Sequence, residues 1–279
     1  MGRARLAIRD TRRIALAACL GLGAWAADQP PTPEEQERFL AATRESALKY
    51  AQSLPDFICT EQIYRSMKRG TGSWREVDWL TVRLSFSSRG EQYTLLQVNG
   101  AATRASFDSL LGSTSRGEFG SLLRGIFEPD AGTQFRFERW VSRDRRPAAV
   151  YSYRIPPGSA SHSLLAFREG EKGRLREAQT GMRGDLVIDA ETTAVLQVTA
   201  IATDIPSGFP IRSSAVRISY GYAQIGARRY LVPSTASSET STATTFHRNR
   251  IEFQKYSKFS TESNIRFEGE GDKKRQENP

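Results

Sequence analysis

A run of alternating apolar and polar residues over 184–260 constrains the fold of this chain more than any other feature. Within 196–203 and 216–222 every second residue is apolar, which is the period of a β-strand with one buried face. Polar reversals at 189–193 and at Gly226 separate neighbouring runs. The stretch therefore predicts five antiparallel strands, which provide a scaffold and not a reaction.

Two helices are predicted outside this stretch. A capping box that starts at Thr32 begins the first helix, at about 33–54. A second capping box, Ser115 with Glu118, begins a short helix at about 117–127, where apolar residues recur at helical spacing. The other candidate strands show the period of two and lie at 57–65, 79–88, 92–98, 135–142 and 149–155.

Together these elements predict a mainly β (α+β) fold, a strongly curved antiparallel sheet or half-barrel with an N-terminal helix and a short covering helix. The charged, glycine-punctuated residues 169–177 predict a loop before the last five strands. No linker divides the chain, so we expect a single domain over 32–265 and a disordered tail at 266–279. The short helix is either a lid over a cavity or a cover for a filled face.

Residues 1–26 have the layout of a secretory signal peptide. Five arginines precede or border an apolar run at 14–23, and Ala-Trp-Ala at 24–26 supplies a cleavage site. The apolar run is shorter than the roughly 20 residues that a membrane-spanning helix needs. We therefore expect export to the periplasm or the outer membrane, with an extracellular location less favoured, and a tether at 27–31.

Lipidation of Cys19 is the alternative fate of this segment. Leu-Ala-Ala-Cys at 16–19 resembles a bacterial lipobox, but only five residues separate Arg13 from Cys19, so cleavage after Ala26 is favoured. Cys59 is then the one remaining cysteine, which excludes an intrachain disulfide in the mature chain. Its apolar neighbours predict a buried, inert thiol.

Charge argues against a nucleic-acid partner. Removing 1–26 takes away five arginines and one aspartate, which lowers the formal net charge from +9 to +5. The remaining charges are mixed in sign along the chain, as on a solvated surface. We therefore expect no nucleic acid, and at most a peripheral contact with a membrane.

The chain also lacks the residues that most enzymes need. It has two histidines, His162 and His247, which cannot complete a zinc site with a single thiol, and it has no phosphate-binding or dinucleotide motif. A hydrolase that uses His162 with Ser161 or Ser163 is the least favoured hypothesis, because no third group that would orient the base is evident. We expect no catalytic site, no metal and no cofactor.

Aromatic residues are more informative, because nearly every candidate strand and the second helix carry them. On the inner face of a curved sheet they could hold a lipid or another apolar ligand. They could equally pack with one another as a core, and the sequence leaves both interpretations open. The candidate ligand contacts come from the second helix and the late strands and are Phe119, Leu122, Tyr220 and Tyr222.

The order of the elements resembles the outer-membrane lipoprotein carrier and lipoprotein-sorting superfamily. The residue patterns that carry this resemblance are GDLVID at 184–189 with VLQV at 195–198, and YGY at 220–222 with YLVP at 230–233. The superfamily implies a half-barrel whose concave face binds acyl chains under helices. No binding motif of the superfamily can be carried over residue by residue.

The chain is also similar to a family of exported bacterial proteins that brings no known activity. The shared segments are SLPDFICT at 53–60, GEFGSLL at 117–123 and FPI at 209–211.

These observations favour a non-enzymatic protein of the cell envelope that binds a lipid, a lipidated protein or another apolar ligand on the concave face of its sheet. The alternative is a protein-interaction or sensor domain of the envelope that has no internal ligand and binds a partner along a sheet edge or on the convex surface.

Overall fold

The structure is a computed structural model that describes residues 30–107, 110, 119–159, 163–168 and 175–259. The predicted signal peptide with Cys19, the predicted tail at 266–279, and both Ser161 and His162 lie outside the described residues.

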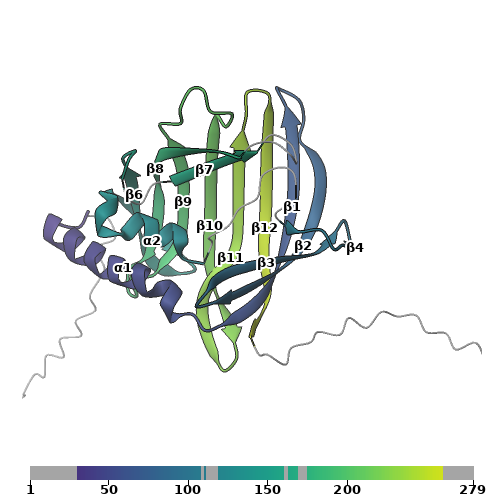
Figure 1. The fold of residues 1–279 in the computed structure, drawn as a ribbon. Helices are drawn as coiled ribbons and strands as arrows, with labels where there is room; N and C mark the ends of the chain where they lie inside the picture. Colours follow the sequence, from purple (N-terminus) through teal and green to yellow (C-terminus); the bar gives the residue numbers. More distant parts are fainter. Residues whose placement is uncertain (1–29, 108–109, 111–118, 160–162, 169–174, 260–279) are drawn as a thin grey trace, which may run out of the picture.

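The described part of the chain forms two α-helices, one 3-10 helix and twelve strands (Figure 1). The helices are α1 (Pro33–Ser53), α2 (Ser121–Phe127) and η2 (Pro129–Ala131). The strands are β1 (Phe57–Arg69), β2 (Arg75–Ser87), β3 (Gly90–Val98), β4 (Ala101–Ala102), β5 (Gln134–Arg143), β6 (Arg146–Ile155), β7 (Ser163–Arg168), β8 (Leu175–Asp189), β9 (Val195–Thr203), β10 (Ser213–Ile225), β11 (Arg228–Ser241) and β12 (Thr245–Lys258).

The strands form one open antiparallel sheet in the order β4-β3-β2-β1-β12-β11-β10-β9-β8-β6-β5, and β7 pairs with β8. Most neighbours in the sheet are also neighbours in the chain. The exception that shapes the molecule is the pairing of β1 with β12, which places the first strand beside the last. The sheet is curved, with α1, α2 and β7 in front of it in Figure 1, and this confirms the predicted fold class.

The first helix follows directly from its local sequence. The Thr32 hydroxyl accepts from the Glu35 N–H at 3.3 Å, and the Glu35 carboxylate accepts from the Thr32 N–H at 2.8 Å, so the capping box is formed. The helix begins at Pro33 and ends at Ser53, against a predicted range of about 33–54. Phe39 stacks on Tyr151 of β6 with ring centroids 5.9 Å apart, which holds α1 against the sheet.

The second helix is shorter than predicted. It begins at Ser121 and not near 117, because Gly120 has a φ of 124°, which no helical residue adopts. The Phe119 N–H bonds to a Glu91 carboxylate oxygen at 3.1 Å instead of entering a helical turn. The predicted capping box of Ser115 and Glu118 lies outside the described residues.

The predicted loop at 169–177 is wrong where it can be checked. Leu175 begins β8, so 175–177 belong to a strand, whereas 169–174 lie outside the described residues. The first part of β8 pairs with β7, a strand that the sequence did not predict. Charged side chains hide the strand periodicity here, and the pairing partner decides the conformation instead of the local preference.

The inner face of the sheet is largely filled by the side chains of the protein. Phe57 is the centre of an aromatic cluster in which its ring lies 5.1 Å from Phe86, 5.1 Å from Phe119 and 5.5 Å from Tyr256. From α2, three side chains enter the same core and are at most 2% exposed: Leu123, Ile126 and Phe127. Of the two roles considered for α2, the structure therefore supports a cover for a filled face.

Candidate functional site

The sheet splits between β11 and β12 near the end of the molecule where β12 finishes. The two strands pair from Ser241↔Phe246 to Thr235↔Glu252. Beyond that last pair β11 stays with β10 and β12 stays with β1. We call the two separated segments, 228–234 of β11 and 253–258 of β12, the split.

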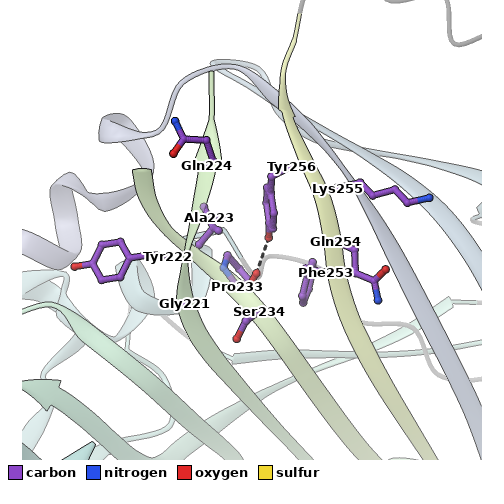
Figure 2. A pocket seen from close by; sticks show the side chains of 11 residues that line it. Gly221, Tyr222, Ala223, Gln224, Pro233, Ser234, Phe253, Gln254, Lys255 and Tyr256 are labelled. Carbon is purple, nitrogen blue, oxygen red and sulfur yellow. Dashed lines mark hydrogen bonds between the residues drawn. The ribbon is translucent and has the colours of Figure 1, made fainter. Parts of the chain in front are cut away.

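Pro233 explains why the β11–β12 ladder stops. The Tyr256 hydroxyl donates to the Pro233 carbonyl at 2.6 Å (Figure 2), so this carbonyl faces β12. In an antiparallel ladder the N–H and the C=O of one residue point to the same neighbouring strand. Proline has no N–H, so Pro233 lacks the donor that the next bond to β12 would need.

Irregularities on both strands widen the opening. The β10–β11 register shifts between Ser219 and Tyr220, which leaves Ser234 as an extra residue in β11. On β12, Lys255 has a φ of 54° and the register with β1 shifts at the same level. An extra residue on each side bends the strands apart, and the Tyr256–Pro233 hydrogen bond is a side-chain bridge across the split.

A pocket of about 340 Å³ occupies the split. Figure 2 shows its side chains coming from three strands, with the Phe253 and Tyr256 rings on β12 facing Pro233 on β11. Its volume is close to the lower end of the range for ligand pockets, about 300–1,000 Å³. The lining residues are Gly221, Tyr222, Ala223, Gln224, Val232, Pro233, Ser234, Phe253, Gln254, Lys255 and Tyr256.

The four candidate ligand contacts lie in different environments. Tyr222 lines the pocket and is 48% exposed. Phe119 is 1% exposed and lies directly behind the pocket, with its ring centroid 5.7 Å from Phe253. Tyr220 is 7% exposed and meets Tyr50 of α1 edge to face. Leu122 is half-buried on α2 and packs against the core without lining the pocket.

Phe253 and Tyr256 are pocket residues that sequence reasoning missed as ligand contacts. Phe253 is 6% exposed and packs in the core, but its ring also lines the pocket. Their spacing of three residues is not that of a strand face. It results from the irregularity at Lys255, which turns both rings to one side. A proline inside a strand pattern, Pro233, was the available signal for an interrupted ladder.

Tyrosine hydroxyls near the site are shielded from water. Burial, the largest cause, and the neighbouring Cys59, Tyr50 and Glu61 raise the pKa of Tyr256 far above its ordinary value, so its hydroxyl stays neutral and donates to Pro233. Burial also raises the pKa of Tyr50, whose hydroxyl makes no hydrogen bond with any described residue. Both tyrosine hydroxyls are thus neutral groups, which an apolar site can hold at lower cost than charged ones.

A buried polar row crosses the same inner face further from the split. Arg65 forms a two-fold contact with Asp78, with N–O distances of 2.6 and 2.5 Å, and both side chains are at most 13% exposed. Arg65 is level with Asn249, which is level with Ser238, so the row spans β2, β1, β12 and β11. Arg65 and Asp78 satisfy each other within this row, whereas the Ser238 hydroxyl has no hydrogen-bond partner among the described residues.

Catalytic chemistry gains no support from the described residues. Among them no group of three or more His, Cys, Asp or Glu could hold a metal ion. Cys59 is 2% exposed, as predicted. Asp189 accepts three hydrogen bonds within its turn, from the Glu191 N–H and from both the N–H and the hydroxyl of Thr192. It therefore stabilises a reversal and has a structural role.

The edge of the open sheet formed by β5 is protected against pairing. Among the described strands β5 pairs with β6 alone, and its register shifts between Phe137 and Arg139. Arg136, Glu138 and Arg139 are exposed along it. A bulge and charged side chains are two devices that discourage addition of a further strand, so this edge gives no support to a partner-binding strand interface.

Within the described residues, no helix combines the length and the apolar character needed to cross a membrane.

No protein-family model matches the chain, and a search of curated proteins found no match. Solved structures similar to it include a DUF1329 family protein from Desulfovibrio piger, with 11% identity and a TM-score of 0.39 over 80% of this chain and 94% of that one. A LolA superfamily protein from Nitrosomonas europaea has 9% identity and a TM-score of 0.34 over 79% and 94%.

A domain assigned to an outer membrane lipoprotein-sorting protein from Vibrio parahaemolyticus has 10% identity and a TM-score of 0.32, covering 78% of this chain and 89% of that one. These TM-scores are low, and the likeness carries no function over to this chain.

Proposed function

We propose that the protein is an exported, non-enzymatic protein of the cell envelope that binds a lipid, a lipidated protein or another apolar ligand at its split. The observation that carries the proposal is the pocket between β11 and β12, where the ladder is interrupted and where Phe253 and Tyr256 face Pro233 across the opening. Export rests on the signal-like residues 1–26.

The rest of the inner face is closed by side chains, so the ligand enters at the split and not beneath α1 and α2. Phe57 and Phe127, for example, are at most 1% exposed. Each methylene group that leaves water contributes up to about 0.8 kcal/mol, so burial of a chain end of about five carbons contributes on the order of 4 kcal/mol before the costs of association.

Native mass spectrometry of the mature protein, isolated from its own cell envelope and followed by organic extraction, tests the proposal. We expect an added mass and an extractable lipid or acyl group. Ala223→Trp places an indole in the pocket and should abolish the added mass. Ala102→Trp is the matched control, because Ala102 is exposed on the short strand β4, far along the sheet from the split.

Tyr222→Ser provides a second variant in case the larger side chain disturbs folding. Tyr222 belongs to the pocket lining and its side chain is 48% exposed, so its removal changes the rim of the pocket with little effect on the core, and the retained ligand should decrease. Wild-type protein that leaves its own envelope at the bare polypeptide mass, with all variants alike, would refute the proposal and would favour the interaction domain without an internal ligand.

A further inference from the structure

Cationic side chains surround the split on both strands. Arg228 and Arg229 begin β11, and Lys255 and Lys258 lie at the end of β12. We call these four residues the basic rim. All four are exposed, and within the described residues none of them forms an ion pair, unlike Arg124, Arg136, Arg146 and Arg248 elsewhere on the surface.

One member of the basic rim lines the pocket, and two others lie at the same end of the split. Lys255 belongs to its lining, and Figure 2 shows its ammonium directed away from the apolar rings. The Arg229 guanidinium lies 5.5 Å from the ring centroid of Tyr222, a residue of the pocket lining whose ring Figure 2 shows directed away from Pro233 and Phe253. Lys258 spans the end of the split, because its Cδ lies 3.8 Å from the position that a Cβ would occupy at Gly226 in the β10–β11 turn.

Acidic groups near the rim are few, and Glu61 of β1, which is level with Phe253, is buried. Glu252 lies one strand position before the split and accepts from the Gln254 side chain at 3.2 Å. Asp56 precedes β1, and its backbone carbonyl accepts from the Phe259 N–H at 3.0 Å. The split therefore combines an apolar interior with an excess of positive charge at its opening, the arrangement that complements an amphiphile with a negative head.

We infer that the split binds an acyl chain that carries an anionic head group, with the chain between β11 and β12 and the head at Arg229, Lys255 and Lys258. Lysine and arginine bind phosphate and carboxylate oxygens through charge-assisted hydrogen bonds. This inference rests on the proposed function, because it requires a chain in the split, and it adds the chemical class of the ligand.

Probes with the same dodecyl chain separate the head from the tail. We would titrate the ligand-stripped full-length mature protein by calorimetry with dodecyl phosphate, with laurate, with zwitterionic dodecylphosphocholine and with neutral dodecyl maltoside. The two anionic probes should bind about tenfold more tightly than the other two, and the preference should shrink as salt is raised. Comparison of dodecyl phosphate with laurate shows whether a phosphate or a carboxylate is preferred.

The variant Arg229→Gln/Lys255→Gln/Lys258→Gln removes the charges beside the pocket. It should weaken binding of the anionic probes about tenfold and leave binding of dodecyl maltoside unchanged, since exposed charges contribute modestly and additively.

The matched control is Arg154→Gln/Arg183→Gln/Arg217→Gln, which changes the net charge equally at exposed positions of β6, β8 and β10. It should leave the preference intact. The salt dependence of the unmodified protein provides a test that needs no variant.

The outcomes distinguish this inference from the proposed function. Equal affinity of the unmodified protein for dodecyl phosphate and dodecyl maltoside, without salt dependence, would overturn the anionic head and leave the apolar site standing. Loss of the preference for anionic probes in the control variant, as complete as in the rim variant, would also overturn the anionic head and leave the apolar site standing. If none of the dodecyl probes binds and Ala223→Trp changes nothing, both proposals fail.

Discussion

Gly184 is the position where one added carbon should disturb the sheet most. A Cβ at Gly184 would lie 1.9 Å from the Thr199 carbonyl oxygen of β9 and 3.1 Å from Cε1 of Tyr153. Gly184 is level with Tyr153 of β6, and the Tyr153 hydroxyl passes over it to donate to the Thr199 carbonyl at 2.8 Å. The Asp185 N–H meanwhile bonds to the Thr199 hydroxyl, so side chains replace ladder bonds here.

The substitution Gly184→Ala should therefore be strongly destabilising. To restore an ordinary contact, β8 and β9 must separate by about 1.5 Å, an overpacking that costs about 1–3 kcal/mol. Displacement of the Tyr153 hydroxyl forfeits a further 0.5–1.5 kcal/mol or so. We expect the free energy of unfolding to fall by about 2–4 kcal/mol, a large part of the roughly 5–15 kcal/mol available to a domain.

Urea unfolding followed by far-ultraviolet circular dichroism measures this loss as a lower midpoint at unchanged slope. Gly208→Ala is the control, since Gly208 is exposed and a Cβ there meets nothing within 4 Å. Both substitutions lower the conformational entropy of the unfolded chain equally, so this contribution cancels when the two variants are compared. Tyr153→Phe isolates the hydrogen bond and should cost about 1 kcal/mol. The reasoning is refuted if Gly184→Ala unfolds at the same urea concentration as Gly208→Ala.

Two further predictions concern the polar groups of the inner face. Burial, with a smaller contribution from the charge of Arg65, lowers the pKa of His247 below its ordinary 6.5. The unfolded chain therefore takes up this proton more readily, and stability should fall as the pH drops below about 6.5. His247→Gln should flatten the dependence of the unfolding midpoint on pH between about 5 and 7, and an unchanged slope would contradict the assignment. Asp78→Asn leaves the Arg65 charge buried without its carboxylate and should lower the free energy of unfolding by about 3 kcal/mol, whereas Arg65→Met/Asp78→Leu should cost less. Denaturant midpoints of the single and double variants check this, and a double variant worse than the single one would argue against it.

Local sequence was sufficient wherever a short segment contains its own reason for folding. The capping box at Thr32 marked the start of α1, and the alternation at 216–222 marked β10. The polar reversal at 189–193 is held by Asp189, which is 2% exposed and accepts hydrogen bonds from the turn. In each case the stabilising contacts lie within a few residues along the chain, so the pattern is visible in one dimension.

Elements that depend on a distant partner were missed or misplaced. β7 and the beginning of β8 have weak strand patterns and form because they pair with each other. The start of α2 was placed too early because the conformation of Gly120 accompanies a bond from the Phe119 N–H to Glu91, far back in the chain. Such contacts override local preference.

The candidate site also depends on contacts between distant parts of the chain. The aromatic residues that could contact a ligand were evident in the sequence, but it could not separate Phe119, which is buried behind the pocket, from Tyr222, which lines it. The sequence by itself determined the alternating strands, their turns and the first helix. Only the tertiary structure decided that β1 joins β12 and that the ladder opens at Pro233, because both depend on which backbone groups meet across the sheet.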